Sequence, residues 1–285
     1  MGETIAVTGK GGVGKTVVAA LMVRLLVEAD EGPVLAVDAD PNLNLNAALG
    51  VEVDDTVGEI REEGLASAAE MPGGMAKAEF LRLRIQQALV EAKGFDLLAM
   101  GRPEGPGCYC FANSILRACV DQIGKQYRYL VIDCEAGLEH LSRRTAGDVD
   151  VLVLLSDPSV RGLDTVARVL ELADGLGTKV GKKVFAFTRV PVGRPSADSS
   201  AEASAKAEAF REGGSPPFKG LPPDLLSAAR ARGLPDPLII PEDAELRELD
   251  AQGKPLVAVS EGSAALAAVK QLLQSAEVLL PGPNV

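Results

Sequence analysis

The sequence is poor in aromatic residues, in histidine and in basic residues. It has 285 residues with no Trp and one His, and aromatic side chains make up 4% of it. Proteins that bind single-stranded nucleic acids commonly stack the bases on aromatic side chains, and this chain supplies few of them. Its 29 Lys and Arg are outnumbered by 40 Asp and Glu, so the net charge is −11 and the surface repels polyanions on average. We therefore expect no nucleic-acid partner.

Long apolar runs are also missing. No stretch approaches the roughly 18 residues that cross a bilayer. The first residues lead into an apolar run without the basic and apolar regions of a signal peptide, and residues 278–285 lack the basic amphipathic pattern of a membrane-surface helix. We expect a cytoplasmic protein with no membrane partner. In such a protein the four cysteines do not form a disulfide framework, so a closely spaced pair indicates metal binding or redox chemistry.

What the sequence does contain is enough apolar residues, 47%, for a large core. Short apolar runs typical of buried strands alternate with segments of helical periodicity. The predicted strands lie at 4–8, 34–37, 95–100, 129–132, 150–155 and 183–190, and the predicted helices at about 15–29, 77–92, 115–126, 160–176 and 263–273. This alternation predicts an α/β fold in three layers: a doubly wound, mostly parallel sheet with helices on both faces.

We expect residues 1–285 to form one domain that carries an insertion at about 191–237. The insertion is rich in Pro, Gly, Ser and Ala, and a segment this long is a lid, a docking element, a partly disordered segment or plain surface decoration. The acidic stretch 51–64 is only loosely patterned, and we interpret it as a solvated face.

The most specific motif is the glycine-rich loop at residues 9–16, between the first predicted strand and helix. Its sequence, Gly-Lys-Gly-Gly-Val-Gly-Lys-Thr, fits the G-x-x-x-x-G-K-T pattern of a phosphate-binding loop. Glycines let backbone N–H groups turn toward an anion, Lys15 adds a charge for the outer phosphates, and the Thr16 hydroxyl is expected to touch Mg²⁺. The predicted nucleotide-binding residues of this segment are Gly11, Gly12, Val13, Gly14, Lys15, Thr16 and Val17.

Two further strands end in aspartates. Asp38 and Asp40 follow the strand at 34–37, and Asp133 follows the strand at 129–132 with Gly137 four residues later. Ligands of open α/β sheets bind at the carboxyl ends of strands. In the Asp-x-x-x-Gly pattern the aspartate reaches the metal, usually through water, and the glycine N–H contacts the γ-phosphate. An aspartate pair after a strand is also common in turns and helix caps.

Cys108 and Cys110 lie in an irregular loop rich in Pro and Gly. Two thiols separated by one residue can face the same soft metal ion, but they make only half of a tetrahedral site. A symmetric dimer with this loop on its two-fold axis would supply four thiolates.

The loop at 9–16, with its second lysine, Lys10, resembles the deviant Walker A motif of the MinD/ParA/nitrogenase-reductase ATPases. The resemblance implies that ATP closes a homodimer in which Lys10 reaches the partner's nucleotide. It also implies that Asp40 positions or activates the attacking water and that Asp38 lies near the metal. The predicted catalytic residues are thus Lys10, Lys15 and Asp40, with ATP, ADP and Mg²⁺ as ligands.

Residues 101–117, 131–145 and 155–162 look like the CooC-type ATPases, accessory proteins for nickel insertion into carbon monoxide dehydrogenase. A related member serves acetyl-CoA synthase. The resemblance implies that Cys108 and Cys110 bind Ni²⁺ or Zn²⁺ between subunits, with carbon monoxide dehydrogenase or acetyl-CoA synthase as client. One departure is Cys134, where the family pattern usually has Asn. We interpret Cys134 and Cys119 as buried small residues and the single histidine, His140, as a structural group.

The base-binding positions depart from the pattern too. Related ATPases commonly read adenine with an Asn and a basic residue at the exit of the sixth strand, and here the pair is Thr188 and Arg189. Threonine has no carboxamide to satisfy both hydrogen-bonding edges of adenine, so the motif predicts phosphate binding without fixing the base. Pro241 and Glu242 resemble the family's adenine-side strand end.

Two other functions stay open on the sequence alone. The first is an iron–sulfur electron carrier like nitrogenase reductase, in which Cys108 and Cys134 would hold the cluster. The second is a positioning ATPase of the MinD/ParA class, which makes no use of the Cys-x-Cys pair.

Overall fold

The computed structural model describes residues 2–66, 76–101, 122–134, 149–175, 179–191, 221 and 223–279. Its centre is an eight-stranded sheet with the order β3-β4-β2-β5-β1-β6-β7-β8. All neighbouring strands are parallel except β3 and β4, which are antiparallel. The strands are β1 (Glu3–Gly9), β2 (Val34–Asp38), β3 (Val90–Glu91), β4 (Phe95–Ala99), β5 (Tyr129–Asp133), β6 (Val149–Ser156), β7 (Val180–Val190) and β8 (Leu238–Pro241). The predicted mostly parallel sheet is confirmed.

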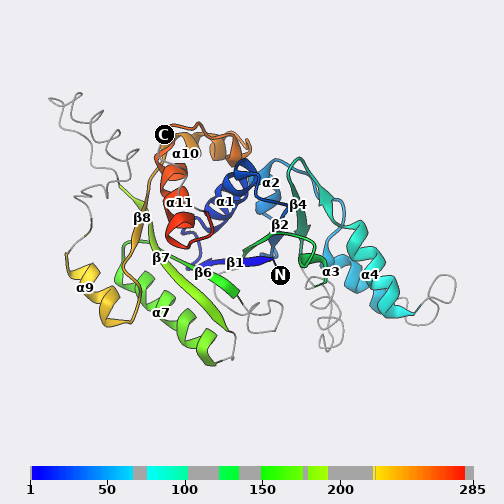
Figure 1. The fold of residues 1–285 in the computed structure, drawn as a ribbon, viewed down its shortest axis with the longest axis horizontal. Coiled ribbons are helices and arrows are strands. Elements are labelled where there is room, and N and C mark those ends of the chain that lie inside the picture. The colour runs from blue at the N-terminus through cyan, green and yellow to red at the C-terminus, as the bar shows by residue number, and fades with distance from the viewer. Residues whose placement is uncertain are drawn as a thin grey trace.

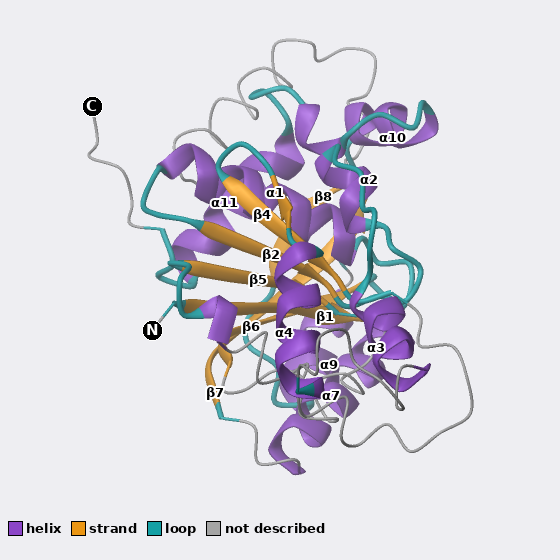
Figure 2. Cartoon of the chain, turned by 90° about the vertical axis from the view of Figure 1, so that its right-hand side faces the viewer, coloured by secondary structure: helices purple, strands orange, loops and turns teal. Residues whose placement is uncertain are grey.

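Helices cover both faces of the sheet, as Figures 1 and 2 show. One face carries α1 (Lys15–Ala29), α2 (Leu45–Leu49), α10 (Ala244–Ala251), the 3₁₀ helix η2 (Leu256–Ala258) and α11 (Ala264–Ser275). The other carries α3 (Val57–Ala66), α4 (Lys77–Gln87), α7 (Val160–Gly175) and α9 (Pro223–Ala231). Among the described residues, no helix combines the length and the apolar character needed to cross a bilayer.

The hydrophobic core is divided in two by the sheet. Along β1, Ile5 and Val7 face the cluster under α1 and α11, and Ala6 faces the cluster under α4 and α7. This alternation follows from the two-residue period of a strand. Because both faces are covered, the strand reads as a continuous apolar run, which is the pattern that made it predictable.

Two predictions on the β4 side of the sheet are wrong. The helix expected over 77–92 ends at Gln87, and Val90–Glu91 pair with β4 through a tight reversal at Gly94, whose φ is 90°. The stretch 51–64, interpreted as a solvated face, contains α3, which buries Val57 and Ile60 against the sheet. Its acidic residues Glu59 and Glu63 are exposed on the outer face of this short helix, whereas Arg61 is buried at 4% exposure.

A capping box begins α3. The Glu59 N–H donates to the Thr56 hydroxyl at 3.2 Å, and the Glu59 carboxylate accepts from the Thr56 N–H at 2.8 Å. This reciprocal pair satisfies two backbone donors at the helix start. It also fixes the position of Thr56 beside Gly101, the residue at which the chain leaves β4.

Part of the predicted insertion belongs to the core. Helix α9 packs on α7 and buries Leu225 and Ala229, and Arg232 forms an ion pair with Asp164 at 2.7 Å. Residues 192–220 of the insertion lie outside the described residues, as does most of the predicted helix at 115–126.

Candidate functional site

The glycine-rich loop joins β1 to α1, as predicted. Gly12 and Gly14 have φ values of 76° and 89°, a left-handed backbone that glycine adopts without steric cost. Gly14 is the N-cap of α1 and has no side chain to bond the first helical N–H groups, so these donors remain available to an anion. Lys15 starts the helix and is buried at 8% exposure. The local structure is therefore that of a phosphate cradle.

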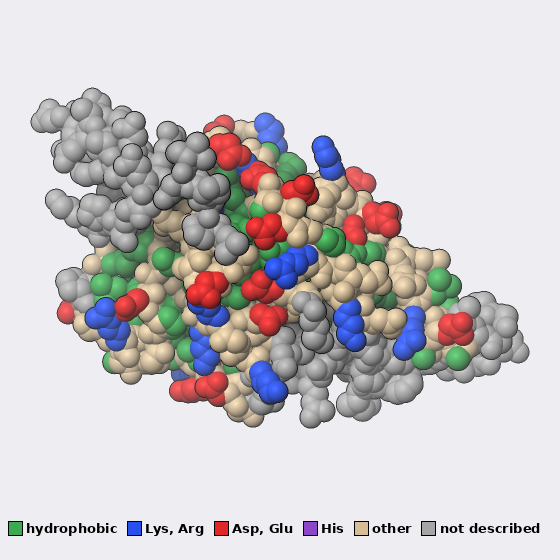
Figure 3. Space-filling view, viewed as in Figure 1, with side chains coloured by type: hydrophobic (Ala, Val, Ile, Leu, Met, Phe, Trp, Pro, Cys, Tyr) green, Lys and Arg blue, Asp and Glu red, His purple; other side chains and the backbone are tan. Residues whose placement is uncertain are grey.

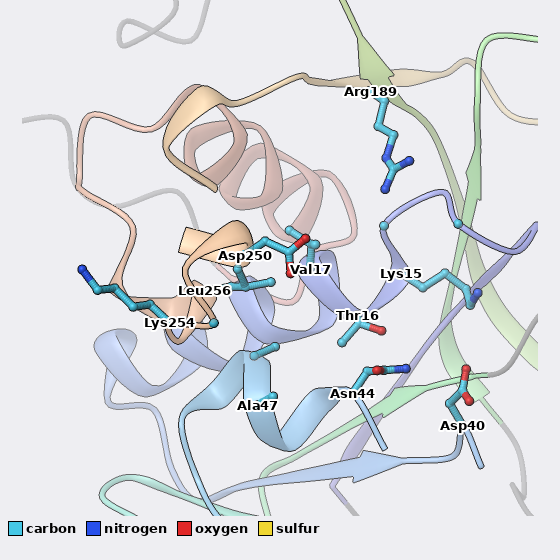
Figure 4. A pocket seen from close by; sticks show the side chains of 14 residues that line it. Lys15, Thr16, Val17, Asp40, Asn44, Ala47, Arg189, Asp250, Lys254 and Leu256 are labelled. Atoms are coloured by element: carbon cyan, nitrogen blue, oxygen red, sulfur yellow. The ribbon is translucent and has the colours of Figure 1, made fainter. Parts of the chain in front are cut away.

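A hydrogen bond from β7 holds the phosphate loop at Val13. The Thr188 hydroxyl donates to the carbonyl oxygen of Val13 at 2.7 Å, and Thr188 is only 3% exposed. The role that this geometry gives Thr188 is to hold the phosphate loop. The next residue, Arg189, sits at an irregularity of the β7–β8 pairing with φ 54°, and its guanidinium extends toward the loop (Figure 4). A non-glycine residue in this region of φ is strained, and such strain commonly marks a functional site.

Asp133 ends β5 beneath the loop. Its Oδ2 atom accepts a hydrogen bond from the Thr16 hydroxyl at 2.6 Å. Its other oxygen, Oδ1, is buried and has no hydrogen-bond partner within the described parts of the chain. Burial raises the pKa of Asp133 to about 7, and the nearby negative charge of Asp38 adds to the effect. The site thus holds a buried carboxylate with one free oxygen beside a hydroxyl.

Asp38 is the register partner of Asp133 between β2 and β5. It is fully buried, and its carboxylate accepts the backbone N–H groups of Asp40 at 3.0 Å, Asn44 at 2.9 Å and Leu45 at 2.9 Å. Burial raises its pKa in spite of these three bonds. These contacts shape the loop after β2, and the expectation that Asp38 lies near the metal stays a prediction.

Asp40 stands on that loop and lines the cavity described below. Its Oδ1 atom accepts from the backbone N–H and the side-chain amide of Asn42, at 2.8 Å and 3.0 Å. The carboxylate therefore stays at the edge of the site, where Figure 4 shows it near Lys15.

Lys10 is paired within its own chain. Its ammonium nitrogen lies 3.1 Å from Oδ2 of Asp157, which follows β6, and Oδ1 of Asp157 accepts from the Ser159 hydroxyl at 2.7 Å. Burial alone would raise the pKa of Asp157, but the hydrogen bonds from Ser159 and Lys10 outweigh it and the pKa is lowered. The ion pair is half exposed, with side-chain exposures of 40% and 36%, so its strength is modest.

A cavity of about 360 Å³ opens beside the loop. It is bounded by the phosphate loop, α2, the exit of β7 and the segment from α10 to η2 (Figure 4). The lining residues are Gly12, Gly14, Lys15, Thr16, Val17, Asp40, Asn44, Ala47, Ala48, Arg189, Asp250, Gly253, Lys254 and Leu256. The loop, Asp40 and Arg189 were predicted from the sequence as nucleotide-binding residues. Helix α2 and residues 250–256 carry no motif and were not predicted.

Pro241 and Glu242 form the bend between β8 and α10. The Glu242 N–H donates to the Val190 carbonyl at 3.0 Å, and its carboxylate lies 3.6 Å from Arg247. Their backbone ties the exit of β8 to the exit of β7, which places α10 over the cavity.

Of the four cysteines, only Cys134 lies within the described residues. Cys108, Cys110, Cys119, Gly137 and His140 lie outside the described residues. No group of three or more His, Cys, Asp or Glu side chains with metal-binding geometry occurs in the part of the chain that the structure describes.

Cys134 confirms its interpretation as a buried small residue, since it is 1% exposed. Burial raises its pKa to about 12. The thiol is therefore protonated at neutral pH in the absence of a metal.

The surface is mixed in charge. On the face shown in Figure 3, Lys and Arg side chains of the described residues are interspersed with Asp and Glu and form no continuous basic patch. This distribution agrees with the acidic net charge of −11.

Comparison with known proteins establishes the family. The family model described as "AAA domain" matches residues 2–184. An uncharacterized ATP-binding protein of Methanocaldococcus jannaschii is 52% identical over 177 residues, which are 61% of this chain and 70% of that protein. The carbon monoxide dehydrogenase accessory protein CooC of Rhodospirillum rubrum is 36% identical over 187 residues, with coverages of 61% and 70%.

Solved structures show the same fold. The septum site-determining protein MinD of Pyrococcus horikoshii, complexed with Mg-ADP, gives a TM-score of 0.62 at 21% identity, over 98% of this chain and 97% of that chain. The chain therefore belongs to the AAA domain family and is a P-loop ATPase of the MinD/ParA type.

Proposed function

We propose that this ATPase is a homodimerising metallochaperone that supplies nickel to carbon monoxide dehydrogenase or acetyl-CoA synthase. Its cargo, Ni²⁺ or Zn²⁺, is bound between the subunits by Cys108 and Cys110. The similarity to an accessory protein of carbon monoxide dehydrogenase supports the choice of client.

The observation that carries the proposal is a set of hydrogen bonds at Met100, just before the segment that contains Cys108 and Cys110 (the cysteine segment). The Met100 N–H, directly after β4, donates to the Asp38 carbonyl at 2.8 Å, and the Met100 carbonyl accepts from the Gly58 N–H at 2.8 Å. The segment that contains Cys108 and Cys110 therefore begins beside the loop that Asp38 shapes. A change in that loop on nucleotide binding has a short path of hydrogen bonds to the start of the cysteine segment.

The residues present fit the Mg²⁺ ion that accompanies ATP. Thr16 and Asp133 would hold it, because a hydroxyl beside a carboxylate with a free oxygen is the hard oxygen donor set that Mg²⁺ prefers. When bound, the ion neutralises charge on the phosphates.

The chain's own residues supply the rest of the hydrolytic chemistry. Lys15 contacts the outer phosphates at the helix start, and Asp40 orients the attacking water from the cavity edge. Lys10 leaves Asp157 and contacts the nucleotide of the partner subunit. ATP then closes the dimer and brings the two Cys108-x-Cys110 pairs together, and hydrolysis separates them.

Such coupling must be reciprocal, which gives a direct test. Ni²⁺ affinity is measured by titration of the purified protein with ADP and with a non-hydrolysable ATP analogue. We expect a difference of about 5- to 150-fold, the usual range of allosteric coupling, and one metal ion per two chains. Equal nickel affinity in both nucleotide states would contradict the proposal.

Cysteine variants locate the metal site. Cys108→Ser and Cys110→Ser should each abolish tight nickel binding and leave ATP binding intact, because phosphate binding uses other residues. Cys119→Ser, which also removes one thiol, is the matched control and should bind nickel as the wild type does. Activation of nickel-free client enzyme by the loaded protein then tests the delivery step.

A further inference from the structure

We infer that Asp250 holds the ribose of the bound nucleotide by accepting hydrogen bonds from its 2′- and 3′-hydroxyl groups. The inference deepens the proposed function and rests only on its nucleotide-binding part. No sequence motif marks Asp250, which lies in the last turn of α10, 234 positions after Thr16 in the chain (250 − 16).

The direction of the nucleotide in the cavity follows from the phosphate loop. In such loops the Lys reaches the β- and γ-phosphates, and the Thr hydroxyl binds the metal between them. Lys15, Thr16 and Asp40 lie together at one end of the cavity in Figure 4. The γ-phosphate belongs at that end, so the nucleoside extends toward the opposite wall, formed by Val17, Asp250 and Leu256.

Asp250 presents an unused acceptor at this wall. No hydrogen bond or ion pair of its carboxylate occurs within the described residues, and Figure 4 shows the carboxylate directed toward Val17. The other charged residues that line the cavity do not neutralise the charge of Asp250. The Lys254 side chain points away from Asp250, and Arg189 approaches from β7 on the phosphate side. The carboxylate is therefore free for a ligand.

The chemistry of a carboxylate selects the ribose. An ionised carboxylate only accepts hydrogen bonds, and it repels the phosphates. The ribose hydroxyls are the neutral donors nearest to the phosphates, and a vicinal diol can occupy both carboxylate oxygens. A carboxylate reads ribose hydroxyls in the same way in dinucleotide-binding folds.

The local backbone keeps Asp250 in place. The Gly253 N–H donates to the Asp250 carbonyl at 3.0 Å, and the Lys254 N–H donates to the Leu249 carbonyl at 2.9 Å, which closes the end of α10. Next to it, Leu256 is buried and Val17 is partly buried, so one side of the sugar would be shielded from water. Asp250 itself is exposed, so the carboxylate is accessible to a ligand that enters the cavity from solvent.

The test compares the Mg²⁺ complexes of ATP, 2′-deoxy-ATP and 2′,3′-dideoxy-ATP by competition against a fluorescent nucleotide. We expect the wild type to bind ATP about tenfold more tightly than 2′-deoxy-ATP, the loss expected for one charge-assisted hydrogen bond. In Asp250→Ala this preference should fall to within about twofold. An unchanged preference in Asp250→Ala, or no preference in the wild type, would overturn the inference.

Three comparisons secure the result. Glu248→Ala removes the same charge from α10 at a position that pairs with Gln252 and does not line the cavity, so its preference should match the wild type. Asp250→Asn keeps the shape and serves where the alanine variant does not fold. If Asp250→Ala changes the preference for ATP over ITP but leaves the preference over 2′-deoxy-ATP intact, Asp250 contacts the base and the inference is wrong. No nickel is present in these experiments, so their failure is separate from failure of the metallochaperone proposal.

Discussion

The ammonium group of Lys10 lies 3.1 Å from a carboxylate oxygen of Asp157, across the sheet position where β1 and β6 are neighbours. The lysine that distinguishes this phosphate loop from ordinary ones is thus held by its own chain. For Lys10 to reach a nucleotide in a second subunit, this pair must break. The pair is half exposed, so breaking it costs about 0.2–1 kcal/mol.

Asp157→Asn should make dimerisation easier. The variant removes the internal competitor for Lys10 in each of the two subunits, so the dimer gains up to about 2 kcal/mol and should form at up to about thirtyfold lower protein concentration. Analytical ultracentrifugation with a non-hydrolysable ATP analogue measures this. The matched control is Asp164→Asn on α7, which breaks the ion pair between Asp164 and Arg232. This variant should dimerise as the wild type does. Weaker dimerisation of Asp157→Asn would show that the pair supports the dimer.

Asp133→Asn should stabilise the nucleotide-free protein at pH 8 and impair ATP hydrolysis. The pKa of Asp133 is raised from 3.8 to about 7, so between these pH values the folded state holds a proton that the unfolded state has released. The free energy of unfolding therefore falls as the pH rises through this window. Asparagine does not titrate, so the variant escapes this loss.

Thermal unfolding at several pH values checks the prediction for Asp133. The Tm of the variant should exceed that of the wild type at pH 8, by about 2–4 °C for each kcal/mol gained, and the difference should shrink toward pH 4. ATP hydrolysis should fall by about 100-fold or more, as for loss of one preorganised electrostatic contact. A variant that is less stable than the wild type at pH 8 would contradict a raised pKa for this buried carboxylate, whose Oδ1 atom has no partner within the described residues.

Thr188→Val should weaken phosphate binding without changing base selectivity. The substitution keeps the shape of the side chain and leaves the Val13 carbonyl without its 2.7 Å hydrogen bond, which costs about 1–3 kcal/mol. The Kd values for ATP, ADP and GTP should rise together. A selective loss of ATP over GTP would instead show that Thr188 reads the base.

Arg24→Ala should loosen the wall of the cavity. Arg24 on α1 donates to the carbonyls of Val257 and Val259 and forms an ion pair with Glu261, and its side chain is 14% exposed. These bonds fix the segment that follows the lining residue Leu256. We expect a loss of about 1–3 kcal/mol in urea unfolding together with a higher KM for ATP.

Arg230→Ala is the control for Arg24. Arg230 is 70% exposed and, in the part of the chain that the structure describes, pairs with Asp236 alone, so its loss should change stability by less than about 0.5 kcal/mol. If both variants behave alike, the segment after Leu256 does not depend on Arg24.

The main strands were predictable because each is covered on both faces and reads as an apolar run. The elements that escaped prediction are short or half-charged. Helix α2 has 5 residues and β3 has 2, too few for a period to be visible. Helix α3 was hidden by its acidic outer face, although its capping box from Thr56 to Glu59 was a readable signal.

The phosphate loop was predictable because its chemistry lies within eight consecutive residues. The burial of Asp38 was not, since it depends on the register of β2 against β5, which sets Asp38 beside Asp133. Asp250 was not visible either, because tertiary packing alone brings α10 to the loop. The sequence thus indicated the phosphate end of the site. The base-side residues that it suggested, Thr188, Arg189, Pro241 and Glu242, stay predictions.

The two edges of the sheet are its shortest strands, β3 with 2 residues and β8 with 4. Within the described residues, β8 pairs with β7 from Ala186 to Val190, so residues 180–185 of β7 have no strand beside them on that side. This stretch carries Lys182 and Lys183, and lysines on an open strand edge oppose pairing with another chain. Charge on this stretch, together with the shortness of β3 and β8, opposes sheet-to-sheet aggregation when the protein is concentrated.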